Sequence, residues 1–391
     1  MSDPDEVDLL KEGRSFFMRV NGSRSGGGWQ LSSLPTHGPL ISVVVIAYNR
    51  PKMLINVLKT LIGQTYSDLE IIVVLHGATT EVRNVVAKFQ VTTRNLKSVS
   101  FPINLFDLNE LTLMFRFVYK AGFEATSGEY VFFQSDDDFV ATDFFSRMAR
   151  LFIDNPACTT AIGLPQSHYW TDRRIVPPSP GAWMDRTTYM DGREAALFCW
   201  ADPHEFMPNP GFSYVMRRDE VLKAKYFWGG FELTHLTQVM PFGVTGFDAK
   251  AAMFWGRGPQ QGNVIGHSMP FPARKNLLLH WIQCNKTERV NAEVMWRDAF
   301  GPNSTKDLTR VLRTREDRSV VYLLAESLAL GRIPTFLHVL RVAPPSFRTI
   351  SSLKMWRIAV ATFFHRLPES FRNFARKFVP SSVIKKVLTL E

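Results

Sequence analysis

Three consecutive aspartates are the residues of this chain whose type and spacing most clearly suggest chemistry. Asp136, Asp137 and Asp138 directly follow a largely apolar stretch, residues 129–134, that has the composition of a buried strand. Adjacent carboxylates repel one another, so this position is unfavourable unless a cation compensates the charge. Mg²⁺ and Mn²⁺ prefer carboxylate oxygens and share their other coordination positions with substrate phosphates. The triplet is therefore a candidate metal site, with a solvated acidic loop as the alternative.

The segments that must position the triplet alternate between strand and helix patterns. Residues 41–47 (ISVVVIA) and 70–75 (EIIVVL) are continuous apolar runs, typical of strands buried on both faces of a mostly parallel sheet. Asn49 and Pro51 are residue types favoured at the start of a helix. Apolar residues recur at helical spacing over 53–62, 82–89 and 109–125. This alternation predicts an α/β fold: an open, mostly parallel sheet with helices on both faces and ligands beyond the carboxyl ends of its strands.

Two stretches of the chain resemble the GT-A, family-2-type glycosyltransferases, which move a sugar from a nucleotide-sugar donor. They are ISVVVIAYNRPKMLINVLKTLIGQTYSDLEIIVV at Ile41–Val74 and ATSGEYVFFQSDDDFV at Ala125–Val140. The resemblance is close over residues 39–157, looser over 158–280 and absent from the remainder. It implies a GT-A, Rossmann-like fold and a nucleotide sugar as the donor substrate.

In that family the loop after the first strand holds the base and ribose of the donor. The matching residues here are Ala47, Tyr48, Asn49 and Arg50. Tyr48 is suited to stack on a base, and Arg50 is suited to meet a phosphate. His76 stands where family members usually carry acidic residues that contact the base, and it is either a donor contact or an ordinary turn histidine.

The acidic motif of the family binds the metal ion that bridges the two phosphates of the donor. The matching run here is Ser135–Asp138, in which a serine replaces the usual first aspartate. The resemblance implies Mn²⁺ or Mg²⁺ at this run. We favour Asp136 and Asp138 as the pair nearest the metal and ribose, and Asp136 and Asp137 as donor contacts, while any two of the three can serve.

An acceptor hydroxyl is a poor nucleophile at neutral pH, so an inverting transfer needs a carboxylate or histidine to take its proton. In the family this base lies downstream of the metal motif, often in a Glu-Asp pair before a helix. The candidates here are Asp248 in TGFDAKAAMFWG, which ranks first, and Glu232 in WGGFELTHL. Each is equally explained as a carboxylate at a helix N-terminus, where the helix dipole favours negative charge.

Composition changes along the chain predict three parts. Residues 1–38, rich in glycine and serine, are an N-terminal tail. Residues 39–285 form the catalytic domain, with a nucleotide-sugar half at 39–157 and an acceptor half at 158–285. Residues 286–391 form a helical C-terminal region with basic amphipathic segments.

Positive charge is concentrated at the end of the chain. The formal net charge is +10, and the last 51 residues hold ten basic and two acidic residues. The nearly neutral remainder, without a groove-reading motif, excludes a nucleic-acid-binding protein. Basic segments with Trp and Phe at helical spacing favour contact with an anionic membrane surface. The alternative is that these rings pack on the catalytic domain or on a second subunit.

The sequence also predicts a location and leaves two functions open. Three widely spaced cysteines, an acidic start without a secretory pattern and no apolar run of bilayer length predict a cytoplasmic protein, peripheral on the cytoplasmic face of the membrane. The first function is a metal-dependent, inverting transfer to a saccharide or lipid-linked saccharide acceptor in cell-surface polysaccharide synthesis. The alternative is a catalytically inactive, membrane-associated binding or assembly protein with the same fold.

Overall fold

The chain divides into two compact units, residues 12–268 and residues 269–391 together with 1–11. A computed structural model describes these residues: 33–106, 112–176, 187–201, 206, 213–229, 232–258, 271–342, 344 and 359–360. Most of the predicted N-terminal tail and most of the basic C-terminal segment therefore lie outside the described residues, and the predicted domain boundaries stay predictions.

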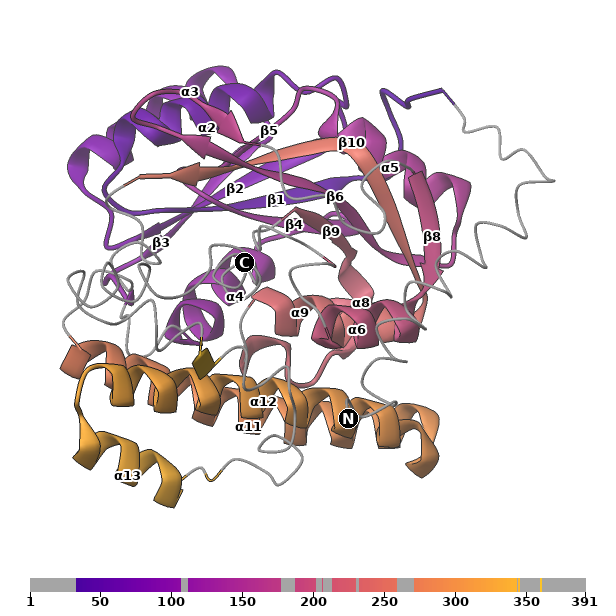
Figure 1. Ribbon diagram of the computed structural model, residues 1–391. Coiled ribbons are helices and arrows are strands. Elements are labelled where there is room, and N and C mark those ends of the chain that lie inside the picture. The colour runs from indigo at the N-terminus through magenta and orange to yellow at the C-terminus, as the bar shows by residue number, and fades with distance from the viewer. Residues whose placement is uncertain are drawn as a thin grey trace. The chain divides into compact units, whose positions relative to one another are not determined.

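The first unit is built on a single sheet, which Figure 1 shows at its centre. Its ten described strands are β1 (Ile41–Ala47), β2 (Leu69–His76), β3 (Leu96–Phe101), β4 (Tyr130–Ser135), β5 (Phe139–Val140), β6 (Cys158–Tyr169), β7 (Ile175–Val176), β8 (Thr187–Asp191), β9 (Tyr214–Arg217) and β10 (Val244–Arg257). The main order is β3-β2-β1-β4-β9-β6-β10-β5, with β7 beside β6 and β8 beside β10. Strands β1 to β4 pair in parallel, β6 and β10 do so too, and β9 is antiparallel to both of its neighbours.

Helices cover both faces of the sheet, as the sequence predicts. The described helices of this unit are α2 (Pro51–Ile62), α3 (Thr80–Thr92), the π-helical turn η1 (Met114–Tyr119), α4 (Lys120–Glu124), α5 (Phe144–Asp154), α6 (Gly192–Ala201), α8 (Arg218–Lys223), α9 (Glu232–Val239) and the short 3₁₀ turns η2 (Phe227–Gly229) and η3 (Met240–Phe242). Every residue of β1 and β2 is buried, because both faces are covered.

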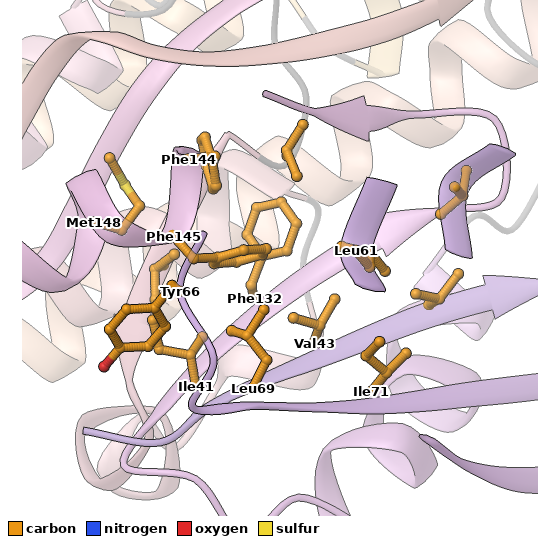
Figure 2. Close-up of a cluster of buried hydrophobic side chains, with 14 of the residues drawn as sticks. Ile41, Val43, Leu61, Tyr66, Leu69, Ile71, Phe132, Phe144, Phe145 and Met148 are labelled. Carbon is orange, nitrogen blue, oxygen red and sulfur yellow. The ribbon is translucent and has the colours of Figure 1, made fainter. Parts of the chain in front are cut away.

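Alternate residues of the central strands meet different helices. Figure 2 shows Val43 and Phe132 on one face, packed with Leu61 of α2 and with Phe144 of α5. On the other face Gly122 of α4 lies so close to Val44 and Val74 that a Cβ would come within 2.4 Å of the first and 2.7 Å of the second. Because successive side chains of a strand point to opposite faces of the sheet, alternate residues pack against different layers of helices.

Three local expectations differ from the structure. Arg50, rather than Asn49, holds the cap position of α2, with Pro51 at its first turn, and Arg50 makes no side-chain capping hydrogen bond. Strand β3 was not expected from the sequence, because most of its residues are exposed or half-buried and its pattern is polar. Within the helical pattern over 109–125, the structure has the π-helical turn η1 in place of regular α-helix, and residues 107–111 lie outside the described residues.

The second unit is helical, as predicted for the C-terminal region. It contains α11 (Phe271–Phe300), the 3₁₀ turn η4 (Pro302–Ser304), α12 (Thr305–Ala329) and α13 (Ile333–Val342). The described apolar core gathers residues from α11, α12 and α13: Ile282, Val320, Leu323, Leu324 and Val339. Arg289 of α11 donates to Glu316 of α12 over 2.6 Å. Among the described helices, none combines the length and apolar character that crossing a membrane requires.

Glu70 of β2 joins the amino ends of the central strands. Its carboxylate accepts hydrogen bonds from Ser42 Oγ at 2.6 Å, from the Ser127 N–H, from Gly128 N–H at 3.0 Å and from Lys97 Nζ at 3.1 Å. Burial alone raises the pKa of Glu70, but these donors outweigh it and lower the pKa to about 2. Glu70 thereby fixes where β4 begins, six strand residues before the aspartate triplet.

We predict that Glu70→Gln lowers the free energy of unfolding by roughly 2–3 kcal/mol at pH 7, since hydrogen bonds to an ionised group are lost. Because the folded-state pKa is depressed, the stabilisation is present above the unfolded pKa and fades as pH falls towards 2. Urea unfolding from pH 7 down to pH 3 measures the effect, with the exposed Glu81→Gln as the control. Equal stability of wild type and Glu70→Gln at pH 7 would contradict the assignment.

Candidate functional site

The carboxyl ends of β1, β2 and β4 meet at one edge of the sheet. In register, Ala47 lies beside Leu75, and Ile46 beside Ser135, so the residues that follow these strands share this edge. The Tyr48 N–H donates to Asp136 Oδ2 over 3.4 Å. The loop after β1 and the triplet after β4 are therefore in contact, as expected for ligand sites of open α/β sheets.

All three aspartates are buried, with 4–6% of their surfaces exposed, which excludes the solvated acidic loop. Arg50 Nη1 lies 3.2 Å from Asp136 Oδ1 and 2.8 Å from Asp137 Oδ2. Asp138 Oδ1 accepts the backbone N–H of Gly256 over 2.8 Å. Protein groups from β10 and from the β1 loop thus hold the triplet in place.

The triplet places three carboxylates side by side, and Arg50 contacts two of them. Burial and the neighbouring Asp137 carboxylate raise the pKa of Asp136 above its usual range, although the Arg50 guanidinium opposes them. Among the described residues, no group of three or more His, Cys, Asp or Glu side chains is arranged to hold a metal ion by itself. Mg²⁺ in nucleotide sites needs only one or two carboxylates, because phosphates supply further ligands. The buried carboxylates therefore fit a divalent cation that binds together with a nucleotide.

The other predicted donor-binding residues lie at the same edge. The Tyr48 and His76 rings are 5.6 Å apart and inclined at 37°. Burial lowers the pKa of His76 to about 4, although a hydrogen bond with Asn104 acts in the opposite direction. The ring is therefore neutral at pH 7. Within the part of the chain that the structure describes, His76 Nδ1 has no hydrogen-bond partner. Ala47 is buried and offers its backbone to this edge, whereas Asn49 is exposed.

The ends of β6 and β10 form a wall beside the triplet. A Cβ at Gly256 would lie 2.3 Å from the Asp137 carbonyl oxygen, so only glycine allows β10 to come this close. Trp170 Nε1 donates to the same carbonyl over 3.1 Å. Phe139 stacks on Phe254 with 4.8 Å between ring centroids. Sequence reasoning missed Gly256 and Phe139, because nothing in the local pattern pairs residue 256 with residues 137 and 138.

Asp248 is not brought together with the triplet. It lies inside β10, not at a helix N-terminus, and is fully buried. Its carboxylate is 2.8 Å from Arg150 Nη2 and 3.5 Å from Arg147 Nη1. Its register partner and that of Gly256 are five residues apart on β6, so about 16 Å of strand separates Asp248 from the triplet wall.

Glu232 is the first residue of α9, and its side chain lies outside the described residues. The assignment of the general base to Asp248 or Glu232 stays a prediction. The geometry gives Asp248 a second role, as the acceptor of a buried ion-pair network that ties α5 to β10.

Comparison with known proteins agrees with this architecture. Residues 42–218 match the family described as glycosyl transferase family 2. An uncharacterized glycosyltransferase of Haemophilus influenzae is 29% identical over 125 residues, which cover 32% of this chain and 36% of that protein. One of Nostoc sp. is 29% identical over 112 residues, which cover 29% of this chain and 32% of that protein. The chain thus spans about a third of the length of the curated relatives it matches.

The mannosyltransferase PcManGT from Pyrobaculum calidifontis, solved in complex with GDP-Man and Mn²⁺, superposes with a TM-score of 0.50. The alignment covers 99% of both chains at 14% sequence identity, a level that shows a common fold. The parallel strands and the two layers of helices agree with these comparisons. Residues 42–218 thus resemble glycosyl transferase family 2, and the chain shares the fold of the solved mannosyltransferase.

Proposed function

We propose that the chain is a metal-dependent glycosyltransferase that moves a sugar from a nucleotide-sugar donor to a saccharide or lipid-linked saccharide acceptor, with inversion, in cell-surface polysaccharide synthesis. One observation carries the proposal: three buried carboxylates follow β4 at the edge of an open α/β sheet, within the segment that matches glycosyl transferase family 2. The solved mannosyltransferase with GDP-Man and Mn²⁺ supports a nucleotide sugar and a divalent cation as its ligands.

The donor is proposed to lie over the β1 loop. The half-buried Tyr48 ring offers a face for the base, and the neutral His76 nitrogen offers one hydrogen bond without a charge. Arg50 lies between this loop and the triplet, so its guanidinium is within reach of a diphosphate placed there. A neutral histidine in place of an acidic base contact implies recognition by a different edge of the base.

Asp136 and Asp138 are the proposed metal ligands, as the sequence suggests, with Asp137 next to them. The contact between Asp136, Asp137 and a guanidinium nitrogen supports a preference of this place for cations. When bound, Mn²⁺ or Mg²⁺ neutralises charge that develops on the departing nucleoside diphosphate. The Gly256 backbone N–H donates to Asp138 and orients its carboxylate.

The acceptor is proposed to lie against the wall formed by β5, β6 and β10. Phe139, Trp170 and Phe254 are half-buried there and offer flat apolar faces beside the Asp137 carbonyl. Pyranose rings have an apolar face that suits such surfaces, and the Trp N–H is already satisfied. The buried ion pairs of Asp248 favour Glu232 as the group that takes the proton of the acceptor hydroxyl.

Contact with an anionic membrane surface and a place on the cytoplasmic face remain proposals from the sequence. They rest on the basic residues from Arg341 onward, of which Arg341 alone lies among the described residues. A lipid-linked acceptor would make such contact useful, because acceptor and enzyme would meet at the same surface.

We expect Asp136→Asn and Asp138→Asn to abolish metal-dependent nucleotide binding, with a loss of about 100-fold or more, since each removes a charged ligand. The fold should persist, because less like charge is buried. Isothermal titration of nucleoside diphosphates, with and without Mn²⁺, measures the effect, and Asp219→Asn on the exposed side of α8 is the control. If the folded wild-type protein bound none of the nucleotides, the result would instead favour a non-catalytic binding protein.

For Asp248→Asn we predict a loss of about 3 kcal/mol or more in unfolding free energy, because Arg150 is left buried without its counter-ion. The partly exposed Asp143→Asn, which pairs with Arg147, should cost far less. Glu232→Gln should keep the stability and lose turnover. Wild-type stability of Asp248→Asn combined with lost turnover would return the role of base to Asp248.

A further inference from the structure

The Arg50 side chain makes contacts with the aspartate triplet that its proposed role as a donor contact does not explain. It is the residue before α2, yet its side chain does not cap that helix. One nitrogen, Nη1, instead pairs with both Asp136 and Asp137, at 3.2 and 2.8 Å. The three side chains are largely buried, with exposed fractions of 24%, 9% and 8%. A cationic group of the protein itself therefore lies against two carboxylates of the triplet.

A nitrogen within hydrogen-bond reach of two carboxylates lies between them. Mg²⁺ binds carboxylate oxygens at about 2.1 Å, so a cation held by Asp136 would lie close to this nitrogen. The guanidinium and the cation carry like charge, and in a buried site their repulsion is only weakly screened. They cannot both hold the Asp136 carboxylate at full strength.

We propose that Arg50 is an internal counter-ion that competes with the divalent cation for Asp136 and Asp137 until the phosphates of the donor draw its guanidinium away. The inference rests on the proposed function, because it assumes that cation and nucleotide share this edge. Guanidinium binds phosphate oxygens with two parallel hydrogen bonds, which supplies the driving force for the exchange. Arg50 is thus a positioning residue that couples two ligands.

The consequence is reciprocal. If the nucleotide removes Arg50 from the carboxylates, it must tighten the cation, and the cation must tighten the nucleotide by the same factor. The cation alone binds weakly, because it has to displace the guanidinium without help. Arg257, the other guanidinium near Asp138, does not fit this role, since it stacks on the Trp255 ring at 3.5 Å.

The test is a titration of Mn²⁺ alone, and then of Mn²⁺ with the nucleoside diphosphate that binds best, at one fixed pH. Wild type, Arg50→Gln, Arg50→Lys and the control Lys97→Gln are compared, Lys97 being another cation paired with a buried carboxylate. We expect Arg50→Gln to bind Mn²⁺ alone about tenfold more tightly than wild type. The mutual tightening, roughly 5- to 150-fold in typical couplings, should be present in wild type and in Lys97→Gln. It should be clearly smaller in Arg50→Gln, where only direct contact between metal and phosphate remains.

Thermal unfolding gives a second readout. Without metal, Arg50→Gln should melt below wild type, and Mn²⁺ alone should raise its melting temperature more than that of wild type. Arg50→Lys keeps the charge and should fall between them, which preserves the test if Arg50→Gln does not fold. Equal affinity for Mn²⁺ alone and undiminished coupling in both Arg50 variants would overturn the inference and leave the proposed function intact. Absence of both Mn²⁺ and nucleotide binding in the folded wild type would overturn both.

Discussion

The burial of three adjacent carboxylates is the constraint on which the rest of the site depends. Asp136, Asp137 and Asp138 are withdrawn from water at the end of β4, where their mutual repulsion is strong. Groups from distant parts of the sequence offset this repulsion: the Arg50 guanidinium, the Tyr48 N–H and the Gly256 N–H. Each of these groups is placed beside the aspartates by a strand of the sheet or by the loop that follows one. The arrangement of the strands therefore determines which groups stabilise the buried carboxylates.

Contacts at the two ends of the parallel strands position these groups. At their amino ends Glu70 collects hydrogen bonds from the segments that begin β1 and β4, which sets the register of the central strands. At their carboxyl ends the same register brings the β1 loop against the triplet. The second half of the sheet adds the wall, since β10 approaches the triplet at Gly256 and is tied to α5 through Asp248 and Arg150.

The sequence predicts the part of this arrangement that local patterns encode. Continuous apolar runs reveal β1 and β2, and the aspartate triplet marks the edge of the sheet where β4 ends. The polar pattern of β3 hides an edge strand. Asp248 looks like a helix-end carboxylate by its neighbours but lies in a strand, and its arginine partners are about 100 residues away in the chain. The closeness of Gly256 to Asp137 is likewise a long-range fact that no spacing rule contains.

The most direct test of the central claim is a crystal structure with Mn²⁺ and a nucleoside diphosphate, in which anomalous scattering locates the metal. We predict one strong peak at the triplet, about 2.1 Å from an oxygen of Asp136, with the Arg50 guanidinium on a phosphate. A metal peak remote from residues 136–138, with Arg50 still paired to Asp136 and Asp137, would contradict it.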